Sequence, residues 1–360
     1  MKINLSGVIN NLSYGIVCTN INTELQKLGV DVALFPIHGQ YEAHPKHFPF
    51  IKQALQNAEK FERHAVSLRL WHQFDLAQHV GRGRHIGFPI FELTKFTDRE
   101  LHHLRNCDEL YVCSQWAKNI IEENDIKTPT FVVPLGVDLE IFTPKLGQRE
   151  KTIFLSAGKI EKRKGHDILH HIFKETFPDE DNVELWMMWE SPHYTPEEIL
   201  EWKMRYRDVL GDRVKFISRQ ASQEDVCKIM QQADCGIFLS RAEGWNLEAL
   251  EMLACGKQII VLDYSGVTEF CNKDNSYLVK TNTLELAFDG KWFTQGIGEW
   301  ASLEDYQVEQ SVQHLRKIHQ LKQGGNLEIN KKGVETAEHF NWRFSAETIV
   351  KHLKGEENVL

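Results

Sequence analysis

A strand, turn and helix unit between residues 234 and 256 is the feature that most constrains the fold. Residues 235–239 form an apolar run between Asp234 and Ser240, which predicts a short buried strand of a parallel sheet. A polar turn ending at Gly244 follows, and the apolar residues after it recur at helical spacing. The first N–H groups of such a helix are unpaired and lie at the carboxyl end of the strand. We therefore expect a phosphate-binding turn here.

Two glutamates mark this unit, Glu243 in the turn and Glu251 in the helix. Their separation of eight residues places them about two helical turns apart and near the same face. One carboxylate could then bind a sugar near the phosphates, and the other could bind the two hydroxyl groups of a ribose. The alternative is that Glu243 is a helix-terminal charge and that Glu248 and Glu251 are solvated surface residues.

Composition bounds the class of protein. With 360 residues, of which 42% are apolar, the chain is long enough for two domains with large cores. The net charge of −9 is concentrated after residue 145, since the residues before it are nearly neutral. This distribution argues against a protein whose whole surface binds nucleic acid or membrane, but it does not exclude a local basic groove.

Cysteine usage and the first residues predict a cytoplasmic protein. The seven cysteines contain no Cys-x-x-Cys pair and lie mostly in apolar contexts, which is typical of reduced core thiols. The start of the chain lacks a signal-peptide pattern, and no apolar run approaches the length needed to span a membrane. The helix expected over residues 48–63 has mixed charge, so we predict no stable membrane insertion.

Apolar strands alternate with amphipathic helices along the whole chain, which predicts an α/β architecture. The expected strands cover residues 3–9, 30–35, 66–71, 85–91, 110–113, 130–133, 152–157, 183–189, 214–217, 235–239 and 258–263. Residues 38–47 are rich in His and Pro and predict a loop. Pro144, Gly147 and charged residues mark a linker over residues 143–151. We therefore expect domains at residues 1–145 and 151–341.

The turn of the second domain resembles a known signature. The run Glu243-Gly244-Trp245-Asn246-Leu247, with Glu251 eight positions after Glu243, is similar to the nucleotide-sugar motif Glu-Gly-Phe-Gly-Leu-Pro of the retaining glycosyltransferases of family 4, also called group 1. This chain has Trp, Asn and, at position 248, Glu where the family usually has Phe, Gly and Pro. The same turn, together with residues 264–271, also resembles bacteriophage members.

The resemblance implies the GT-B fold, in which two Rossmann-like domains face each other across a cleft. A C-terminal helix, here about residues 342–360, crosses back to the first domain in that fold. Residues 158–165 resemble the turn that binds the donor diphosphate, with Lys159 and Lys164 as its basic pair. Fixed cations there stabilise the charge that the departing nucleoside diphosphate gains. The alternative interpretation is a solvated run of surface charge.

The resemblance also assigns the remaining site residues. Glu243 would hold the donor sugar, and His72 and Glu92 are acceptor-side candidates that orient or deprotonate a hydroxyl. Many relatives have a His at the position of Glu92, so the base remains open, and His72 alone is also explained as a polar strand end. The donor-binding residues implied are Gly15, Arg163, Ser218, Arg219, Gly244, Trp245, Asn246, Leu247 and Glu251. Residues 13–15 are otherwise an ordinary turn.

The implied function is retaining transfer of a sugar from a nucleoside diphosphate sugar to an acceptor hydroxyl, with a saccharide or a lipid-linked saccharide as acceptor. We expect neither a metal nor a cofactor, because no Asp-x-Asp sequence stands at a suitable strand end. The alternatives are a phage enzyme that glycosylates 5-hydroxymethylpyrimidine bases in DNA, a sugar-nucleotide-binding protein without turnover, and an epimerase. A DNA acceptor requires a basic groove, for which the candidates are Lys46, Lys52, Arg82, Arg84 and Lys95.

Overall fold

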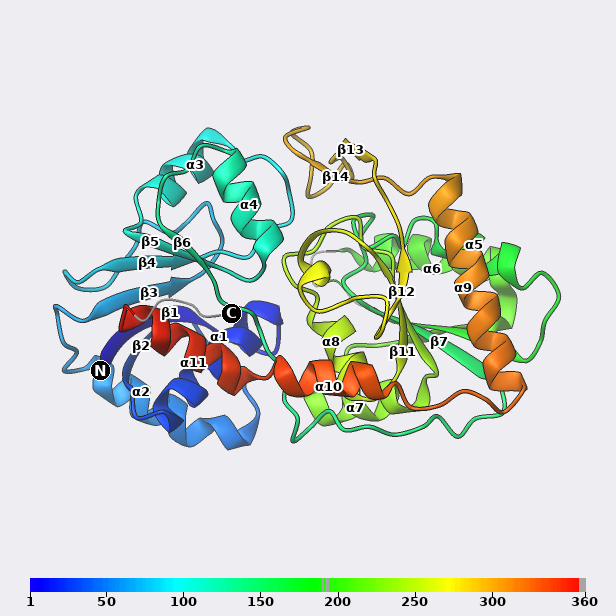
Figure 1. The fold of residues 1–360 in the computed structure, drawn as a ribbon, viewed down its shortest axis with the longest axis horizontal. Coiled ribbons are helices and arrows are strands. Elements are labelled where there is room, and N and C mark those ends of the chain that lie inside the picture. Colours follow the sequence, from blue (N-terminus) through cyan, green and yellow to red (C-terminus); the bar gives the residue numbers. More distant parts are fainter. Residues whose placement is uncertain (190, 192–193, 356–360) are drawn as a thin grey trace. The chain divides into compact units, whose positions relative to one another are not determined.

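The chain folds into two compact units, which are described separately here. The computed structural model describes residues 1–189, 191 and 194–355, without the side chain of Gln40. Unit 1 contains residues 1–136 and the C-terminal segment from Phe340, and unit 2 contains Val137–His339 (Figure 1). The C-terminal helix thus belongs to the same unit as the N-terminal half of the chain, as the sequence predicts.

Unit 1 is built on a parallel sheet of six strands in the order β2-β1-β3-β4-β5-β6. Its strands are β1 (Lys2–Ile9), β2 (Asp31–Tyr41), β3 (Val66–Leu70), β4 (His85–Phe88), β5 (Glu109–Val112) and β6 (Thr130–Val132). Its helices are α1 (Ser13–Lys27), the 3-10 helix η1 (Pro45–His47), α2 (Phe48–Ala58), α3 (Asp98–Arg105), α4 (Gln115–Glu123) and α11 (Trp342–Leu353).

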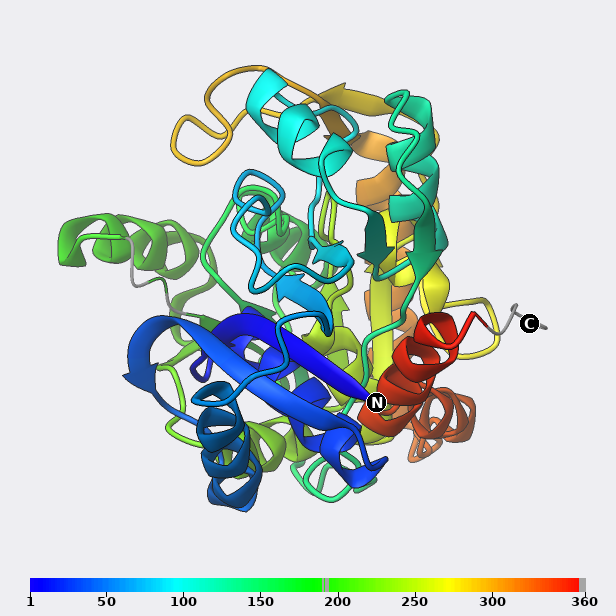
Figure 2. The same ribbon diagram turned by 90° about the vertical axis from the view of Figure 1, so that its left-hand side faces the viewer.

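Helices cover the sheet of unit 1 as their apolar faces require. The buried residues Leu104 of α3, Leu110 of β5 and Ile120 of α4 share one apolar core. The helix α11, red in Figure 2, packs against α1. The strand order reverses between β1 and β3, so the turns that follow these two strands lie at the point where open α/β sheets bind ligands.

Unit 2 contains a second parallel six-stranded sheet, in the order β12-β11-β10-β7-β8-β9. Its strands are β7 (Thr152–Gly158), β8 (Val183–Trp189), β9 (Val214–Ile217), β10 (Cys235–Phe238), β11 (Gln258–Leu262) and β12 (Tyr277–Val279), with the antiparallel pair β13 (Leu284–Leu286) and β14 (Glu299–Ala301) outside the sheet. Its helices are α5 (Leu169–Thr176), α6 (Pro196–Leu210), η2 (Gly211–Arg213), α7 (Gln223–Gln232), α8 (Leu247–Ala254), η3 (Ser265–Glu269), α9 (Asp305–Gln323) and α10 (Lys331–His339).

The core of unit 2 joins the central strands to one layer of helices. Phe154 of β7 packs with Phe173 of α5, Tyr206 of α6 and Leu315 of α9, while α8 contacts α10. The strand order of this sheet is that of a dinucleotide-binding fold, with its reversal between β7 and β10. The turns after β7 and β10 therefore meet at the carboxyl edge of the sheet, at its switch point.

The structure corrects three local predictions. Residues 13–15 form the first turn of α1 and not a separate turn, because the chain already reverses at Asn10, whose Oδ1 accepts the N–H of Leu12 at 3.0 Å. The predicted loop begins later than residue 38, because β2 continues beside β1 as far as Tyr41. The strand expected over residues 85–91 ends at Phe88, since Pro89 has no N–H to donate.

Candidate functional site

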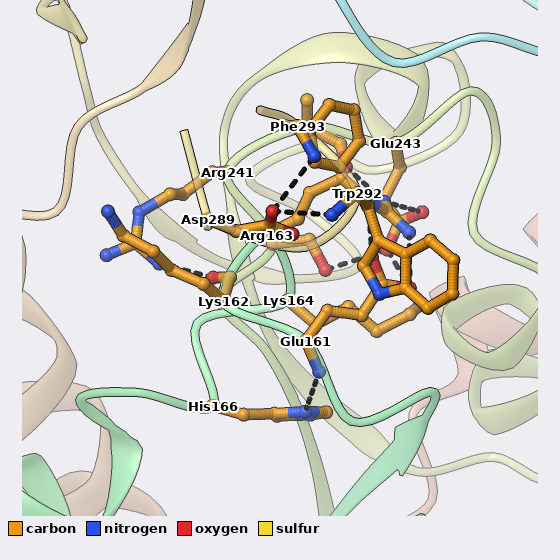
Figure 3. Close-up of polar contacts among 12 residues, drawn as sticks. Glu161, Lys162, Arg163, Lys164, His166, Arg241, Glu243, Asp289, Trp292 and Phe293 are labelled. Atoms are coloured by element: carbon orange, nitrogen blue, oxygen red, sulfur yellow. Dashed lines mark hydrogen bonds and ion pairs between the residues drawn. The ribbon is translucent and has the colours of Figure 1, made fainter. Parts of the chain in front are cut away.

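The turns after β7 and β10 of unit 2 form a buried cluster of charged side chains (Figure 3). At its centre lies Glu243, which is 6% exposed. Its Oε1 is 2.8 Å from Nζ of Lys164, and its Oε2 is 2.8 Å from the guanidinium of Arg163. Ser240 also donates to Oε1, at 2.8 Å, so both carboxylate oxygens are bonded. Glu243 thus contacts Arg163 and Lys164, from which it is separated by about 80 positions in the sequence.

These contacts decide the charge of Glu243. Burial by itself raises the pKa of this carboxyl, but the charges of Arg163 and Lys164 and the hydrogen bonds from both outweigh burial and lower the pKa to about 2. Burial lowers the pKa of Lys164, while Glu243 and then Glu248 raise it, with a net increase. Both groups are therefore ionised at neutral pH. The carboxylate of Glu243 is therefore held in a fixed position, and its negative charge is stabilised by neighbouring cations and not by solvent.

Glycine is required where this cluster packs most tightly. Gly158 has φ +126°, and a Cβ at this residue would lie 2.9 Å from Nζ of Lys164. A Cβ at Gly266 would lie 2.2 Å from the carbonyl oxygen of Gly244. These two glycines let the ammonium of Lys164 and the turn of Gly244 lie directly against neighbouring backbone.

Sequence reasoning missed the groups that hold the cluster in place. The hydroxyl of Ser265 accepts the N–H of Glu243 at 2.8 Å, and Glu161 accepts from Nε and NH2 of Arg163 at 3.1 and 3.2 Å. Arg241 forms a bidentate pair with Asp167, at 2.8 and 2.9 Å. The sequence signals for these groups were the Ser in the turn of residues 264–269 and the Arg in the turn that follows β10.

The segment formed by β13, β14 and the loop between them is attached to the same turns. Lys162 donates to the carbonyl oxygen of Phe288 at 3.1 Å, and Arg241 pairs with Glu285 at 2.9 Å. Within the loop, Oδ1 of Asp289 accepts the N–H groups of Lys291, Trp292 and Phe293 (Figure 3).

His166 supports the turn from beneath. Its Nδ1 accepts the N–H of Glu161 at 3.5 Å, and its Nε2 lies 3.3 Å from the hydroxyl of Ser156. Burial first, and then the charge of Lys164, lower the pKa of His166 from 6.5 to about 3. The imidazole is therefore neutral, because a second positive charge beside Lys164 would be uncompensated.

This shift predicts a pH dependence of stability. The folded state binds the proton of His166 more weakly than the unfolded chain, so the contribution is fully present above pH 6.5 and is lost as the pH falls towards about 3. We expect the free energy of unfolding of the wild type to fall faster than that of His166→Gln, with a difference in slope approaching about 1.4 kcal/mol per pH unit. Urea unfolding between neutral pH and about pH 5 measures it. Parallel curves for the two proteins would contradict the assignment.

The helix α8 begins at this cluster with unpaired donors. Within the described part of the chain, the backbone N–H groups of Gly244, Asn246 and Leu247 have no hydrogen-bond acceptor. Asn246 caps the helix, since its Oδ1 accepts the N–H of Ala249 at 3.1 Å. Trp245 is buried, with its ring 4.9 Å from that of Phe270. Free N–H groups and the positive end of the helix dipole together favour an anion.

Glu251 lies in α8 in a different environment. It is 7% exposed, and no described residue makes a hydrogen bond or ion pair with its carboxylate. Burial, and then the negative charge of Glu248, raise the pKa of Glu251 well above its usual range. A buried carboxyl without a protein partner is a position where a ligand with hydroxyl groups gains hydrogen bonds. The interpretation of Glu251 as a solvated surface residue is wrong.

The other residues predicted for the donor side are more exposed. Lys159 follows β7 and is exposed, whereas Lys164 is buried, so the two lysines do not form a matched pair. Ser218 and Arg219 follow β9 and are both exposed. Because β9 is the edge strand of the sheet, these two residues lie two strands away from the end of β7.

Gly15, His72 and Glu92 belong to unit 1. A Cβ at Gly15 would lie 2.2 Å from the backbone of Asn10, so the close start of α1 requires glycine. The ring of His72 lies 4.6 Å from that of Tyr14. The Tyr14 hydroxyl donates to the carbonyl oxygen of Ile90 and accepts its N–H, each at 3.0 Å. Tyr14 thereby connects the turn after β1 to the segment that carries Glu92.

The described residues contain neither a metal-binding cluster nor a membrane-spanning helix. No cluster of three or more His, Cys, Asp and Glu side chains in this part of the chain is arranged to hold a metal ion. None of the helices in residues 1–189, 191 and 194–355 combines the length and apolar character that a membrane crossing requires.

Comparison with known proteins finds a family match in unit 2 and related sequences that align with part of the chain. Residues 151–289 match the family described as "Glycosyl transferases group 1". The chain is 25% identical over 189 residues to MMP α-(1→4)-mannosyltransferase of Mycolicibacterium hassiacum, a match that covers 52% of this chain and 43% of the relative. It is 27% identical over 154 residues to D-inositol 3-phosphate glycosyltransferase of Jonesia denitrificans, covering 38% and 36%. The matches therefore span less than half the length of these relatives.

Solved structures match the whole chain. Sucrose-phosphate synthase from Thermosynechococcus elongatus aligns with a TM-score of 0.72 at 16% identity, over 99% of this chain and 98% of that one. Anabaena HepE, solved in complex with UDP and glucose, aligns with a TM-score of 0.67 at 15% identity, over 98% and 99%. The chain therefore has the GT-B fold predicted from its sequence, and its residues 151–289 match the glycosyl transferases group 1 family.

Proposed function

We propose that this protein is a retaining glycosyltransferase that moves a sugar from a nucleoside diphosphate sugar to the hydroxyl of a saccharide or lipid-linked saccharide. The observation that carries the proposal is the ionised Glu243, held between Arg163 and Lys164 beside the unpaired N–H groups at the start of α8. A sugar hydroxyl needs such a carboxylate, and the diphosphate next to it needs such N–H donors. The match to group 1 glycosyltransferases covers the same residues.

In this proposal the bond between the anomeric carbon and the phosphate oxygen breaks while the acceptor oxygen bonds to the anomeric carbon on the same face of the sugar. The proton of the acceptor hydroxyl passes to the departing phosphate oxygen. Glu243 holds the donor sugar, and the N–H groups of Gly244, Asn246 and Leu247 bind the diphosphate. The cations Lys159, Arg163 and Lys164 stabilise the charge that develops on the leaving group, so that the reaction proceeds without a metal ion. His72 and Glu92 of unit 1 are the candidates that orient the acceptor hydroxyl.

Nucleoside diphosphate release from a panel of UDP-, GDP- and ADP-sugars tests this function. Each donor is assayed alone, with a mixture of saccharides, and with DNA that contains 5-hydroxymethylcytosine, in buffer with and without EDTA. We expect release that requires a saccharide and is unaffected by EDTA. Nucleoside diphosphate release that requires DNA would show that the acceptor is DNA and not a saccharide. Conversion of a donor to its epimer without release of nucleoside diphosphate would indicate an epimerase. Binding without any turnover would refute the enzymatic proposal.

Glu251 provides a separate prediction about the donor ribose. An ionised Glu251 accepts hydrogen bonds from both hydroxyls of a ribose, so we expect Glu251→Gln to raise the KM for the donor by about 10- to 100-fold. Removing the 2′-hydroxyl of the donor ribose should raise the KM of the wild type by a similar factor. The same change of donor should raise the KM of Glu251→Gln only slightly further. Equal discrimination against the deoxy donor by both proteins would contradict a ribose contact.

The raised pKa of Glu251 gives this contact a pH dependence. The carboxyl must lose its proton to accept two hydroxyl groups, and burial favours the protonated form. Donor affinity of the wild type should therefore rise with increasing pH, whereas Glu251→Gln should be insensitive to pH at this site. Binding titrations at a series of pH values measure the difference.

A further inference from the structure

Asn246 occupies a strained position that its side chain partly explains. It is the N-cap of α8 and has φ 85°, in the left-handed region that few residues other than glycine adopt. Asparagine tolerates this conformation because its side chain bonds to nearby backbone, and here Oδ1 accepts the N–H of Ala249 at 3.1 Å. The cap therefore accounts for the backbone conformation and for the side-chain oxygen.

The cap does not explain the side-chain nitrogen of Asn246. Asn246 is 5% exposed, and its Nδ2 has no acceptor among the described residues. The amide cannot simply be reversed, because the N–H of Ala249 requires an oxygen at the capping position. Aspartate caps a helix as well as asparagine does, and glycine adopts this φ without strain. Neither the cap nor the conformation explains why the position carries a buried amide nitrogen.

The other unpaired donors of the same turn indicate what this nitrogen binds. The backbone N–H groups of Gly244, Asn246 and Leu247 are also unpaired, and they lie at the positive end of α8. The carboxylate of Glu243, by contrast, is bonded on both oxygens. A set of unpaired N–H donors at one turn fits an anion that presents several oxygens.

We propose that Nδ2 of Asn246 donates a hydrogen bond to a phosphate oxygen of the donor diphosphate and so sets the affinity of the site for the diphosphate. This inference rests on the proposed function and adds to it a residue that acts through its side chain. The backbone N–H groups of the turn contact the anion whatever residue stands at position 246. The amide nitrogen of this chain adds a donor that a glycine at the same position lacks.

The variant Asn246→Asp separates the two roles of the residue. Aspartate keeps the capping oxygen and the tolerance of positive φ, but it removes the N–H donors and adds a negative charge beside the phosphate. We expect the Kd for the nucleoside diphosphate to rise by about 10- to 100-fold, while the Kd for the matching nucleoside is unchanged. Asn246→Gly keeps the backbone conformation and should show a smaller loss of diphosphate affinity, together with a lower Tm from the lost cap.

The experiment is isothermal titration with UDP, GDP and ADP and with uridine, guanosine and adenosine, for the wild type and both variants, with Tm measured in parallel. A ratio of nucleoside Kd to diphosphate Kd that falls in Asn246→Asp, at a Tm equal to or above that of the wild type, supports the proposal. An unchanged ratio overturns it while leaving the proposed function intact. If the wild type binds no nucleoside diphosphate and releases none from the sugar panel, both proposals fail.

Discussion

Replacing Glu243 with Gln is expected to lower kcat/KM for sugar transfer by about 100-fold or more, the loss typical of one preorganised electrostatic group in an active site. Glutamine keeps the volume of the side chain and still accepts one hydrogen bond, from Lys164 or Ser240. It removes the charge that balances Arg163 and Lys164, both of which are buried with it. Rates of nucleoside diphosphate release over a range of donor concentrations measure the effect.

The same substitution should also destabilise unit 2, because removing one partner of a buried ion pair costs about 3–5 kcal/mol. Glu248→Gln is the matched control. Glu248 lies in the first turn of the same helix, 3.9 Å from Nζ of Lys164 and with 31% of its side chain exposed. Its replacement leaves the bonds of Glu243 to Arg163, Lys164 and Ser240 in place, and we expect activity within a few-fold of the wild type. Glu243→Gln protein that is folded and equally active would refute the role of Glu243.

Replacing Lys164 with Met is the second large effect. Methionine retains the apolar stem but removes the ammonium that bonds Glu243 and balances the leaving diphosphate, so we expect kcat to fall by about 100- to 1,000-fold. The pKa of Glu243 should rise, because one of the two cations that lower it is gone. The pH profile of kcat/KM in the variant should consequently lose activity at a higher pH than the wild type does on the acid side.

Two comparisons make the Lys164 prediction specific. Lys164→Arg should not restore activity, because the ammonium lies against Gly158 and the larger guanidinium has no room there. Lys159→Met removes a cation of the same turn that is exposed, so stability should be unchanged and the loss of activity smaller. Rescue by arginine, or a larger loss from Lys159→Met than from Lys164→Met, would contradict the assignment.

Much of the fold followed from local patterns. The strands predicted at residues 183–189 and 214–217 have the bounds of β8 and β9, because apolar runs mark both strands. The errors fell where local signals were weak. The β2 strand continues through a His- and Pro-rich segment because its neighbour β1 supplies the pairing, a contact between residues more than 30 positions apart.

For the candidate site, the sequence by itself indicated the turns after β7 and β10, which the structure brings together. Glycines, basic residues and glutamates stand directly after predicted strands, and parallel strands bring such turns to one edge of a sheet. Only the tertiary structure decided how the charges are paired. It bonds Lys164 and Arg163 to Glu243, leaves Lys159 exposed, and buries Glu251 without a partner. The physical reason is that burial and pairing depend on contacts between segments about 80 residues apart, and a linear pattern of residue types does not specify them.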